Sequence, residues 1–361
     1  MRRKTRQINV GGVLIGGDAP ISVQSMTNTD TRDVSATINQ VHALEKVGCE
    51  IVRVAVPNME AAEVLGEIKK AISIPLIADI HFDYRLALRA IDAGVDGLRL
   101  NPGNIRSEER VKEVVKVAKG RAIPIRIGVN AGSLEKDILE RYGHPTPEGM
   151  VESAIRHIQM LEDLDFFDIK VSLKASDVLK TIEAYRLLAE RLAPVPMLRD
   201  KQGGDYPFHI GITEAGTIFS GAIKSAVGLG ILLAEGIGDT LRVSLTGDPV
   251  EEVRVGWGIL KALRLRERGV NVISCPTCGR IRVDAIRLAE EIERRLAHIT
   301  KPINIAVMGC VVNGPGEAVE ADIGIAGGEG VGLLYVKGNV VKKVKEEEIV
   351  DVVVREVEGL V

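Results

Sequence analysis

Two stretches of this sequence decide its fold: Ile125–Asn130 reads IRIGVN and Ile169–Lys174 reads IKVSLK. In both, apolar residues alternate with polar or small ones, and successive side chains of a β-strand point to opposite faces. A strand of an open parallel sheet is covered on both faces and reads as a continuous apolar run. The alternation therefore predicts a sheet with an apolar face against helices and a polar face around an enclosed lumen.

The same pattern recurs along the first three quarters of the chain. The eight predicted strands are Ile21–Met26, Ile51–Val56, Leu76–Ile80, Gly97–Asn101, Pro124–Asn130, Phe167–Lys174, Phe208–Thr213 and Leu241–Thr246. The predicted helices between them include Asn58–Ile72, Ser107–Lys119, Glu148–Leu164 and Asp177–Leu192. Eight strands alternating with helices over about 250 residues predict a (β/α)8 TIM barrel rather than the rival fold, a doubly wound open sheet.

An arginine-rich stretch, Arg264–Val270, marks a predicted domain boundary. We expect a TIM barrel that binds the substrate over residues 1–264 and a small α+β domain that holds a metal centre over 265–361. In the second domain the sequence predicts a helix at Val283–His298 and a strand at Ile303–Met308. Short strands near 322–325, 332–336 and 340–343 and a C-terminal helix complete it.

The overall charge excludes several classes of protein. Lys plus Arg number 47 and Asp plus Glu 50, so the net charge of -3 provides no positive field for nucleic acid or an anionic membrane. No apolar run approaches the roughly 18 residues that cross a bilayer, and the N-terminus does not read as a signal peptide. We expect a cytoplasmic protein.

The polar face of the predicted barrel is rich in cations. Inward positions near the carboxyl ends of the strands carry Arg53, Arg99, Arg126, Lys170, Lys174 and Arg242, against the acids Asp79, Asp168 and Glu214. Active sites of this fold lie at those strand ends, and arginine binds phosphate through two parallel hydrogen bonds. For any one of these cations, the alternative to phosphate binding is an ion pair within the barrel, such as Asp79 with Arg99. Because cations outnumber acids, the set predicts a small substrate with one or two phosphates.

Three further lumen residues have two interpretations each. His81 and His209 are either catalytic or simply hydrogen-bonded side chains of the lumen. Glu214, just past the seventh strand, is either a general acid whose pKa is raised by burial or an ordinary residue at a helix start.

Three of the four cysteines lie in the last quarter of the chain, and four in 361 residues are too few for a disulfide scaffold. Ser274–Arg280 reads SCPTCGR and Met308–Glu317 reads MGCVVNGPGE. A C-x-x-C pair with a distant third cysteine predicts a metal or redox site. The fourth cysteine, Cys49, is interpreted as a small buried hydrophobe.

Two kinds of centre remain open for Cys275, Cys278 and Cys310. A structural zinc ion wants four ligands, so His298 or Glu317 would have to supply the fourth. An iron–sulfur cluster with three thiolates leaves one iron with a different ligand or open to substrate. Glu317 follows the Gly-Pro-Gly turn directly, and its alternative is a solvated loop acid.

From about residue 5 to its end, the sequence resembles one known family. The cysteine motifs look like those of the bacterial 4-hydroxy-3-methylbut-2-enyl diphosphate synthases of the methylerythritol phosphate pathway of isoprenoid synthesis, the IspG/GcpE family. Further blocks similar to the family's are QSMTNTDT at 24–31, ADIHF at 78–82, RLNPGN at 99–104, GVN at 128–130 and TEAG at 213–216.

The resemblance implies a [4Fe–4S] cluster held by Cys275, Cys278, Cys310 and Glu317. It implies a two-electron reductive ring opening of 2C-methyl-D-erythritol 2,4-cyclodiphosphate with loss of water, with electrons from ferredoxin or flavodoxin. It also implies a head-to-tail homodimer, in which the barrel of one chain faces the cluster of the other, and Glu214 as the proton donor. The residues implied to bind or line the substrate are Arg53, Asp79, His81, Arg99, Asn101, Arg126, Asn130, Lys174, Arg242 and Ser244.

Two other classes stay open from the residues alone. One is a phosphate-handling barrel enzyme without redox chemistry whose tail holds a structural zinc ion. The other is an iron–sulfur scaffold without catalysis. Visible colour separates a cluster from zinc, and the cationic lumen argues against a scaffold, because a carrier needs no anion pocket.

Overall fold

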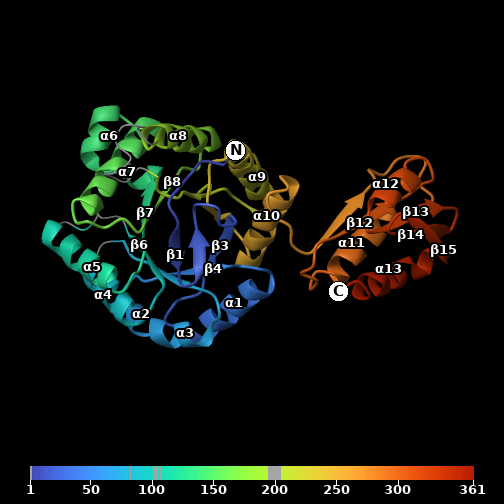
Figure 1. The fold of residues 1–361 in the computed structure, drawn as a ribbon, viewed down its shortest axis with the longest axis horizontal. Coiled ribbons are helices and arrows are strands. Elements are labelled where there is room, and N and C mark those ends of the chain that lie inside the picture. The colour runs from blue at the N-terminus through green and yellow to red at the C-terminus, as the bar shows by residue number, and fades with distance from the viewer. Residues whose placement is uncertain (1, 82, 101–104, 106, 194–204) are drawn as a thin grey trace. The chain divides into compact units, whose positions relative to one another are not determined.

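The computed structural model describes residues 2–81, 83–100, 105, 107–193 and 205–361. The chain divides into two compact units, Met1–Arg266 and Glu267–Val361 (Figure 1). In the described part of the chain, no helix has the length and apolar character needed to cross a membrane.

The first unit is built on one sheet of eight parallel strands in the order β8-β7-β6-β5-β4-β3-β10-β9. The strands are β3 (Ser22–Met26), β4 (Ile51–Ala55), β5 (Leu76–Asp79), β6 (Gly97–Leu100), β7 (Ile125–Asn130), β8 (Ile169–Lys174), β9 (His209–Ile210) and β10 (Thr240–Leu241). The two ends of the sheet meet where Val171 of β8 bridges Phe208, which directly precedes β9. The sheet is therefore a closed TIM barrel, which confirms the predicted fold.

Helices alternate with these strands. They are α1 (Val34–Lys46), α2 (Met59–Glu63), α3 (Leu65–Ala71), α4 (Tyr84–Asp92), α5 (Glu108–Gly120), α6 (Lys136–Tyr142), α7 (Pro147–Glu162), α8 (Val178–Arg191), α9 (Ile218–Ala234) and α10 (Pro249–Ala262). Short polar side chains begin several of them; Asp33, Asp177 and Asp248 each accept a hydrogen bond from a backbone N–H of the first turn. The single helix predicted for 58–72 is two helices that meet at Val64.

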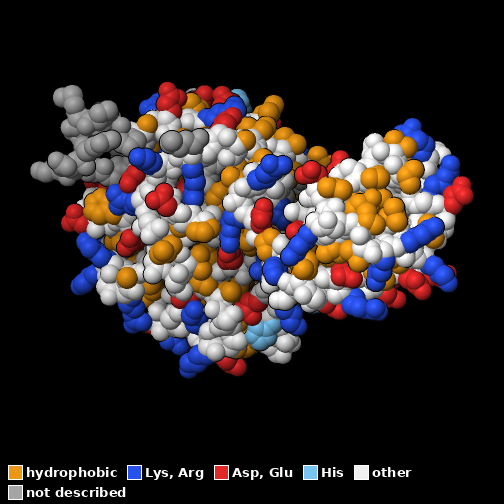
Figure 2. Space-filling view, turned by 45° about the vertical axis from the view of Figure 1, so that its right-hand side comes forward, with side chains coloured by type: hydrophobic (Ala, Val, Ile, Leu, Met, Phe, Trp, Pro, Cys, Tyr) orange, Lys and Arg blue, Asp and Glu red, His pale blue; other side chains and the backbone are white. Residues whose placement is uncertain are grey.

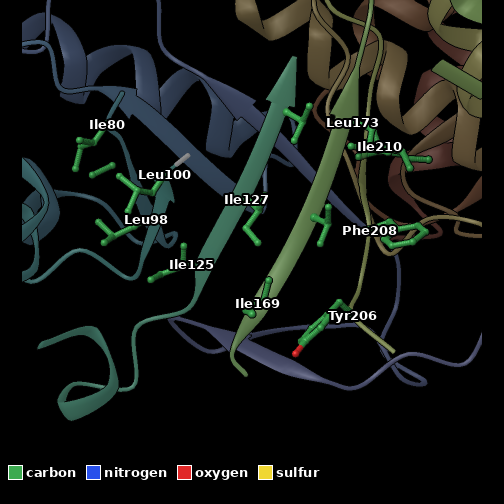
Figure 3. Close-up of a cluster of buried hydrophobic side chains, with 14 of the residues drawn as sticks. Ile80, Leu98, Leu100, Ile125, Ile127, Ile169, Leu173, Tyr206, Phe208 and Ile210 are labelled. Atoms are coloured by element: carbon green, nitrogen blue, oxygen red, sulfur yellow. The ribbon is translucent and has the colours of Figure 1, made fainter. Parts of the chain in front are cut away.

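The apolar residues of the strands form the layer between sheet and helices. Figure 3 shows Ile125 and Ile127 of β7 beside Ile169 and Leu173 of β8 within this buried cluster. The same cluster contains apolar residues of the covering helices, such as Ile158 of α7. The alternation in the sequence therefore has the predicted physical cause. The apolar residues of each strand face the helices, and the residues between them face the lumen.

A β-hairpin that the sequence analysis did not predict precedes the barrel. It consists of β1 (Ile8–Val10) and β2 (Val13–Ile15). Its turn is Gly11-Gly12, and both glycines have positive φ angles, which glycine adopts without strain. The apolar residues of the hairpin pack against Ile51 and Ile77, near the first residues of β4 and β5. The hairpin therefore covers the amino-terminal end of the lumen.

The second unit has a five-stranded sheet in the order β11-β12-β13-β14-β15. The strands are β11 (Val270–Ser274), β12 (Ile303–Met308), β13 (Ile323–Gly328), β14 (Val331–Val336) and β15 (Asn339–Lys345), and the first three are parallel. Helices α11 (Ala285–Arg295) and α13 (Ile349–Glu358) pack on one face, whereas α12 (Gly314–Glu320) packs on the other. The sequence analysis missed β11 and α12, the two elements that flank the cysteines.

Candidate functional site

The polar face of the barrel is buried and strongly cationic, as the sequence predicts. Five of the predicted cations are at most 7% exposed, namely Arg53, Arg99, Arg126, Lys170 and Lys174. The strand register places Asp79, Arg99, Arg126 and Lys170 next to one another across β5 to β8. Because a buried charge is costly unless an opposite charge meets it, the partner of each cation decides what the lumen can bind.

Asp79, the last residue of β5, is shared by two of the arginines. Its carboxylate lies 3.3 Å from Arg53 Nε, 3.2 Å from Arg99 Nη1 and 3.5 Å from His81 Nε2. Burial alone would raise the pKa of Asp79, but Arg53, Arg99 and Arg126 outweigh burial and lower that pKa to about 2. Burial and Arg99 lower the pKa of His81, which favours the neutral imidazole. Asp79 is therefore a fixed anion that orients two arginines.

Arg242 has a partner that the sequence analysis missed. Its Nη2 atom donates to Glu252 Oε1 at 3.1 Å, and the same carboxylate accepts from Ser25 Oγ at 2.9 Å and from the Leu245 N–H at 3.0 Å. Glu252 is 4% exposed although it lies on helix α10. No sequence signal marks this acid, because a helical glutamate usually faces solvent.

Three buried cations have no carboxylate partner within the described part of the barrel. They are Arg126, Lys170 and Lys174. Burial, followed by repulsion from Arg126, lowers the pKa of both lysines well below the usual lysine range. Burial and the same cations also lower the pKa of His209, which keeps that imidazole neutral. The lumen thus has a deficit of negative charge that an anionic ligand would fill.

Two glycines make room for these cations. A Cβ atom on Gly128 would lie 2.5 Å from Arg99 Nε, and one on Gly211 would lie 2.5 Å from Lys174 Nζ. Real Cβ atoms do not approach other atoms so closely, so any other residue would displace the cation. Glycine at these inward strand positions is a sequence signal for side chains that cross the lumen.

The mouth of the barrel is a hollow of about 480 Å³ at the carboxyl ends of the strands. His81, Asn130 and Glu214 line it, together with the β8–α8 loop around Ser176. Ser244 is half-buried close to the end of β10. Asn101 lies outside the described residues.

The predicted position of Asp168 is wrong. It is exposed, because it precedes β8 at the amino end of the barrel instead of facing into the lumen. Glu214 lies at the mouth, where it is exposed, and its φ angle is 52°.

The cysteines lie at one edge of the second unit, beyond the carboxyl ends of two paired parallel strands. Cys275 directly follows β11 and Cys310 follows β12, and Ser274 pairs in register with Val307. The Gly309 N–H donates to Cys275 Sγ at 3.2 Å. The Val312 N–H lowers the pKa of Cys310 most, and the Asn313 N–H and Arg280 lower it further. All four cysteines of the chain are free thiols.

The side chains at this edge are suited to a metal centre held by thiolates. Within the described residues, no three His, Cys, Asp or Glu side chains lie close enough together to hold one metal ion. Donors that stabilise thiolates are present, and Glu317 lies in the first turn of α12, a helix that begins four residues after Cys310. His298 follows α11 and precedes the amino end of β12, so it lies at the opposite edge of the sheet. The zinc site with His298 is therefore wrong.

Comparison with known proteins agrees with both units. The GcpE TIM-barrel domain matches residues 5–257, and the GcpE protein C-terminal domain matches residues 271–359. The chain belongs to the GcpE family. Among its relatives is the 4-hydroxy-3-methylbut-2-en-1-yl diphosphate synthase (flavodoxin) of Geobacter sulfurreducens, 64% identical over 100% of this chain and 99% of the relative. The enzyme of the same name from Symbiobacterium thermophilum is 60% identical over 99% of this chain and 93% of its own. Family membership makes the chain an oxidoreductase of isoprenoid biosynthesis.

Among solved structures, dihydropteroate synthase from Xanthomonas albilineans in complex with 7,8-dihydropteroate is 13% identical with a TM-score of 0.48, covering 72% of this chain and 98% of that one.

Proposed function

We propose that this GcpE-family enzyme converts 2C-methyl-D-erythritol 2,4-cyclodiphosphate to 4-hydroxy-3-methylbut-2-enyl diphosphate. Two electrons and a proton open the ring of the dianionic substrate and give a linear trianionic diphosphate and water. The observation that carries the proposal is that Arg126 and Lys174 are buried in the lumen without a carboxylate partner among the described residues. A diphosphate supplies the missing negative charge, and full-length relatives carry the name of this synthase.

The lumen residues bind and orient the diphosphate. Asp79 holds Arg53 and Arg99, and Glu252 holds Arg242. The three guanidinium groups are therefore oriented before the substrate binds. Arg126 and Lys174 add unpaired positive charge, and Ser244 adds a neutral donor. His81 and Asn130, at the mouth, face the carbon skeleton of the substrate.

Glu214 is the proposed proton donor for the hydroxyl group that leaves as water. It lies on the rim of the mouth, next to Thr213 and across the hollow from His81. In the single chain it is exposed. A covering surface would remove its carboxyl group from water, as proton donation at neutral pH requires.

A [4Fe–4S] cluster bound by Cys275, Cys278, Cys310 and Glu317 would supply single electrons and a Lewis-acidic iron. The Gly309 N–H at Cys275 and the N–H groups at Cys310 stabilise the thiolates that such a cluster needs. Glu317 is exposed and would be the one oxygen ligand of such a cluster, held less firmly than the three thiolates.

The proposed electron donor is flavodoxin or ferredoxin, and the proposed assembly is a head-to-tail homodimer in the cytoplasm. Two apolar surfaces support the dimer. Phe219 on α9, close to the mouth, is 79% exposed, and Val311 and Val312, beside Cys310, are 61% and 62% exposed. Figure 2 shows hydrophobic side chains gathered on the visible face of the C-terminal unit. A second copy that covers both surfaces would also shield Glu214 from water.

Anaerobic purification followed by an absorption spectrum and an iron and sulfide count tests the function. We expect a brown protein with about four irons per chain, and a spectrum that changes when the cyclic diphosphate is added. A colourless protein with one zinc ion per chain would overturn the redox mechanism and leave only the anion-binding barrel.

The dimer is tested separately by analytical ultracentrifugation. Phe219→Asp is expected to yield monomers with an intact cluster and little activity, whereas the exposed Lys224→Asp control stays dimeric. A wild-type monomer with full activity would contradict the assembly.

A further inference from the structure

Lys170 is a buried lysine to which the proposed reaction assigns no role. It is the second residue of β8, 2% exposed, and its Nζ atom has no hydrogen-bond partner. Lys174 lies four residues further along the same strand, so about 13 Å separates the two Cα positions. Lys170 is therefore on the floor of the lumen and does not reach a ligand at the mouth.

Its neighbour across the sheet is the lumen arginine Arg126. The two residues are paired in register on β7 and β8, and their side chains lie on the same face. Arg126 is also 2% exposed, and its Nε and Nη1 atoms have no partner. The floor thus brings together two buried groups that both lack hydrogen bonds.

Two neighbouring buried cations would destabilise the folded protein, so only one of these two side chains carries a charge at low cost in free energy. Among the described residues, the charged groups that act on Lys170 are Arg126 and Arg53, both positive, and no carboxylate offsets their repulsion. The guanidinium of arginine does not lose its proton in proteins, whereas a buried lysine does. A neutral amine has a lone pair, and Arg126 has unpartnered N–H groups to donate to it.

We propose that Lys170 is a positioning residue, held as a neutral amine whose lone pair accepts from the unpartnered N–H groups of Arg126. The remaining edge of the guanidinium is then directed up the lumen, where the diphosphate binds. This inference rests on the proposed function for the identity of the ligand, but the state of the amine does not depend on it.

The other groups that face Lys170 agree with a neutral amine. Arg53, which comes from β4, is positive and acts on Lys170. His209 from β9 is fully buried, its two ring nitrogens have no partner, and burial with the surrounding cations lowers its pKa. None of these groups supplies negative charge. Burial, followed by Arg126, lowers the pKa of Lys170 well below its usual range.

Nuclear magnetic resonance of the full-length protein with 13C-labelled lysine side chains tests the charge state directly. We expect a lysine Cε signal at the position of a neutral amine at pH 7 that disappears in Lys170→Met but remains in Lys174→Met, the other buried lysine, and in the exposed control Lys116→Met. A protonated Lys170 at pH 7 would overturn the proposal. If Lys170→Met does not fold, Lys174→Met decides, because a neutral-amine signal that remains in that variant belongs to Lys170, and its absence there shows that Lys170 is protonated.

Calorimetry with inorganic diphosphate tests the positioning. Lys170→Met is expected to weaken binding about tenfold in the wild-type background and not at all in the Arg126→Met background, because the effect passes through Arg126. Equal losses in both backgrounds would contradict it. Neither readout needs turnover, so failure of the proposed reaction would leave this result interpretable.

Discussion

The barrel and the C-terminal unit hold their functional groups in opposite ways. In the barrel, Arg126 and Lys174 are rooted in strands and are at most 6% exposed. In the C-terminal unit, Cys278 and Glu317 are exposed, on a loop and on the first turn of a short helix. The fold itself therefore positions the residues of the anion site. The cysteines and Glu317 would take their final positions only when they bind a metal centre. Functional groups on strands are positioned more precisely than groups on loops.

The largest expected effect comes from removing a cysteine on the exposed side of this comparison. Cys310→Ser should lose most of its iron and at least about 100-fold in activity, since even outer-shell changes at metal sites cost up to that much. The binding of inorganic diphosphate by the barrel should be unchanged. Iron analysis and calorimetry measure the two effects, and Cys49→Ala, at a buried cysteine of the barrel, serves as the control. Normal iron content in the Cys310 variant would remove it from the ligand set.

Lys174→Met should produce opposite effects on binding and on stability. Loss of a charge-assisted contact is expected to weaken diphosphate binding by about 10- to 100-fold. Because the buried cation has no carboxylate partner, its removal should raise the free energy of unfolding of the ligand-free protein by about 1–3 kcal/mol. Denaturant titration and calorimetry test this, with the exposed Lys116→Met as control. A less stable variant would show that Lys174 has a partner in the free protein.

The lowered pKa of Asp79 predicts that the stability of the barrel depends on pH. Its pKa falls from 3.8 to about 2 on folding, so the unfolded chain binds more protons between these values and stability is lost as pH falls from about 4 toward 2. The loss amounts to about 2 kcal/mol at about 1.4 kcal/mol per pKa unit. Unfolding of the first unit measured from pH 5 to pH 2 should show this loss in the wild type. The same slope in Asp79→Asn would assign the effect to another carboxylate.

Gly128→Ala should weaken diphosphate binding less than Lys174→Met does. The added Cβ would meet Arg99 Nε at 2.5 Å, so the guanidinium must move away from Asp79. We expect about tenfold weaker diphosphate binding and a loss of about 1–3 kcal/mol from overpacking. Gly132→Ala has open space around its Cβ and is the matched control. Unchanged binding by Gly128→Ala would show that the position of Arg99 is not critical.

Sequence-based prediction succeeded where a pattern has a direct physical cause. The alternation in β7 and β8 assigned Arg126 and Lys170 to the lumen, and both are buried there. Residues at strand ends were harder to place. Asp168 continues the alternation but precedes β8 and is exposed, because the pattern alone does not say where the pairing of a strand begins.

Elements without periodicity escaped prediction as well. The strand β11 has only five residues, and α12 begins inside a Gly-Pro-Gly turn that was interpreted as a loop. Both elements are stabilised by packing against the rest of the sheet. Because each is short, its own sequence contains too little periodicity to predict it. The hairpin β1–β2 has only three residues in each strand and was missed for the same reason.

The sequence by itself determined which side chains face the lumen and which thiols belong together, because periodicity and motif spacing are local properties of the chain. Only the tertiary structure decided which charged groups pair. Glu252 reaches Arg242 from a helix, two arginines share Asp79, and no described carboxylate pairs with Lys170. Charge pairing depends on distances between segments that are far apart in the chain. The closing of the barrel sets those distances.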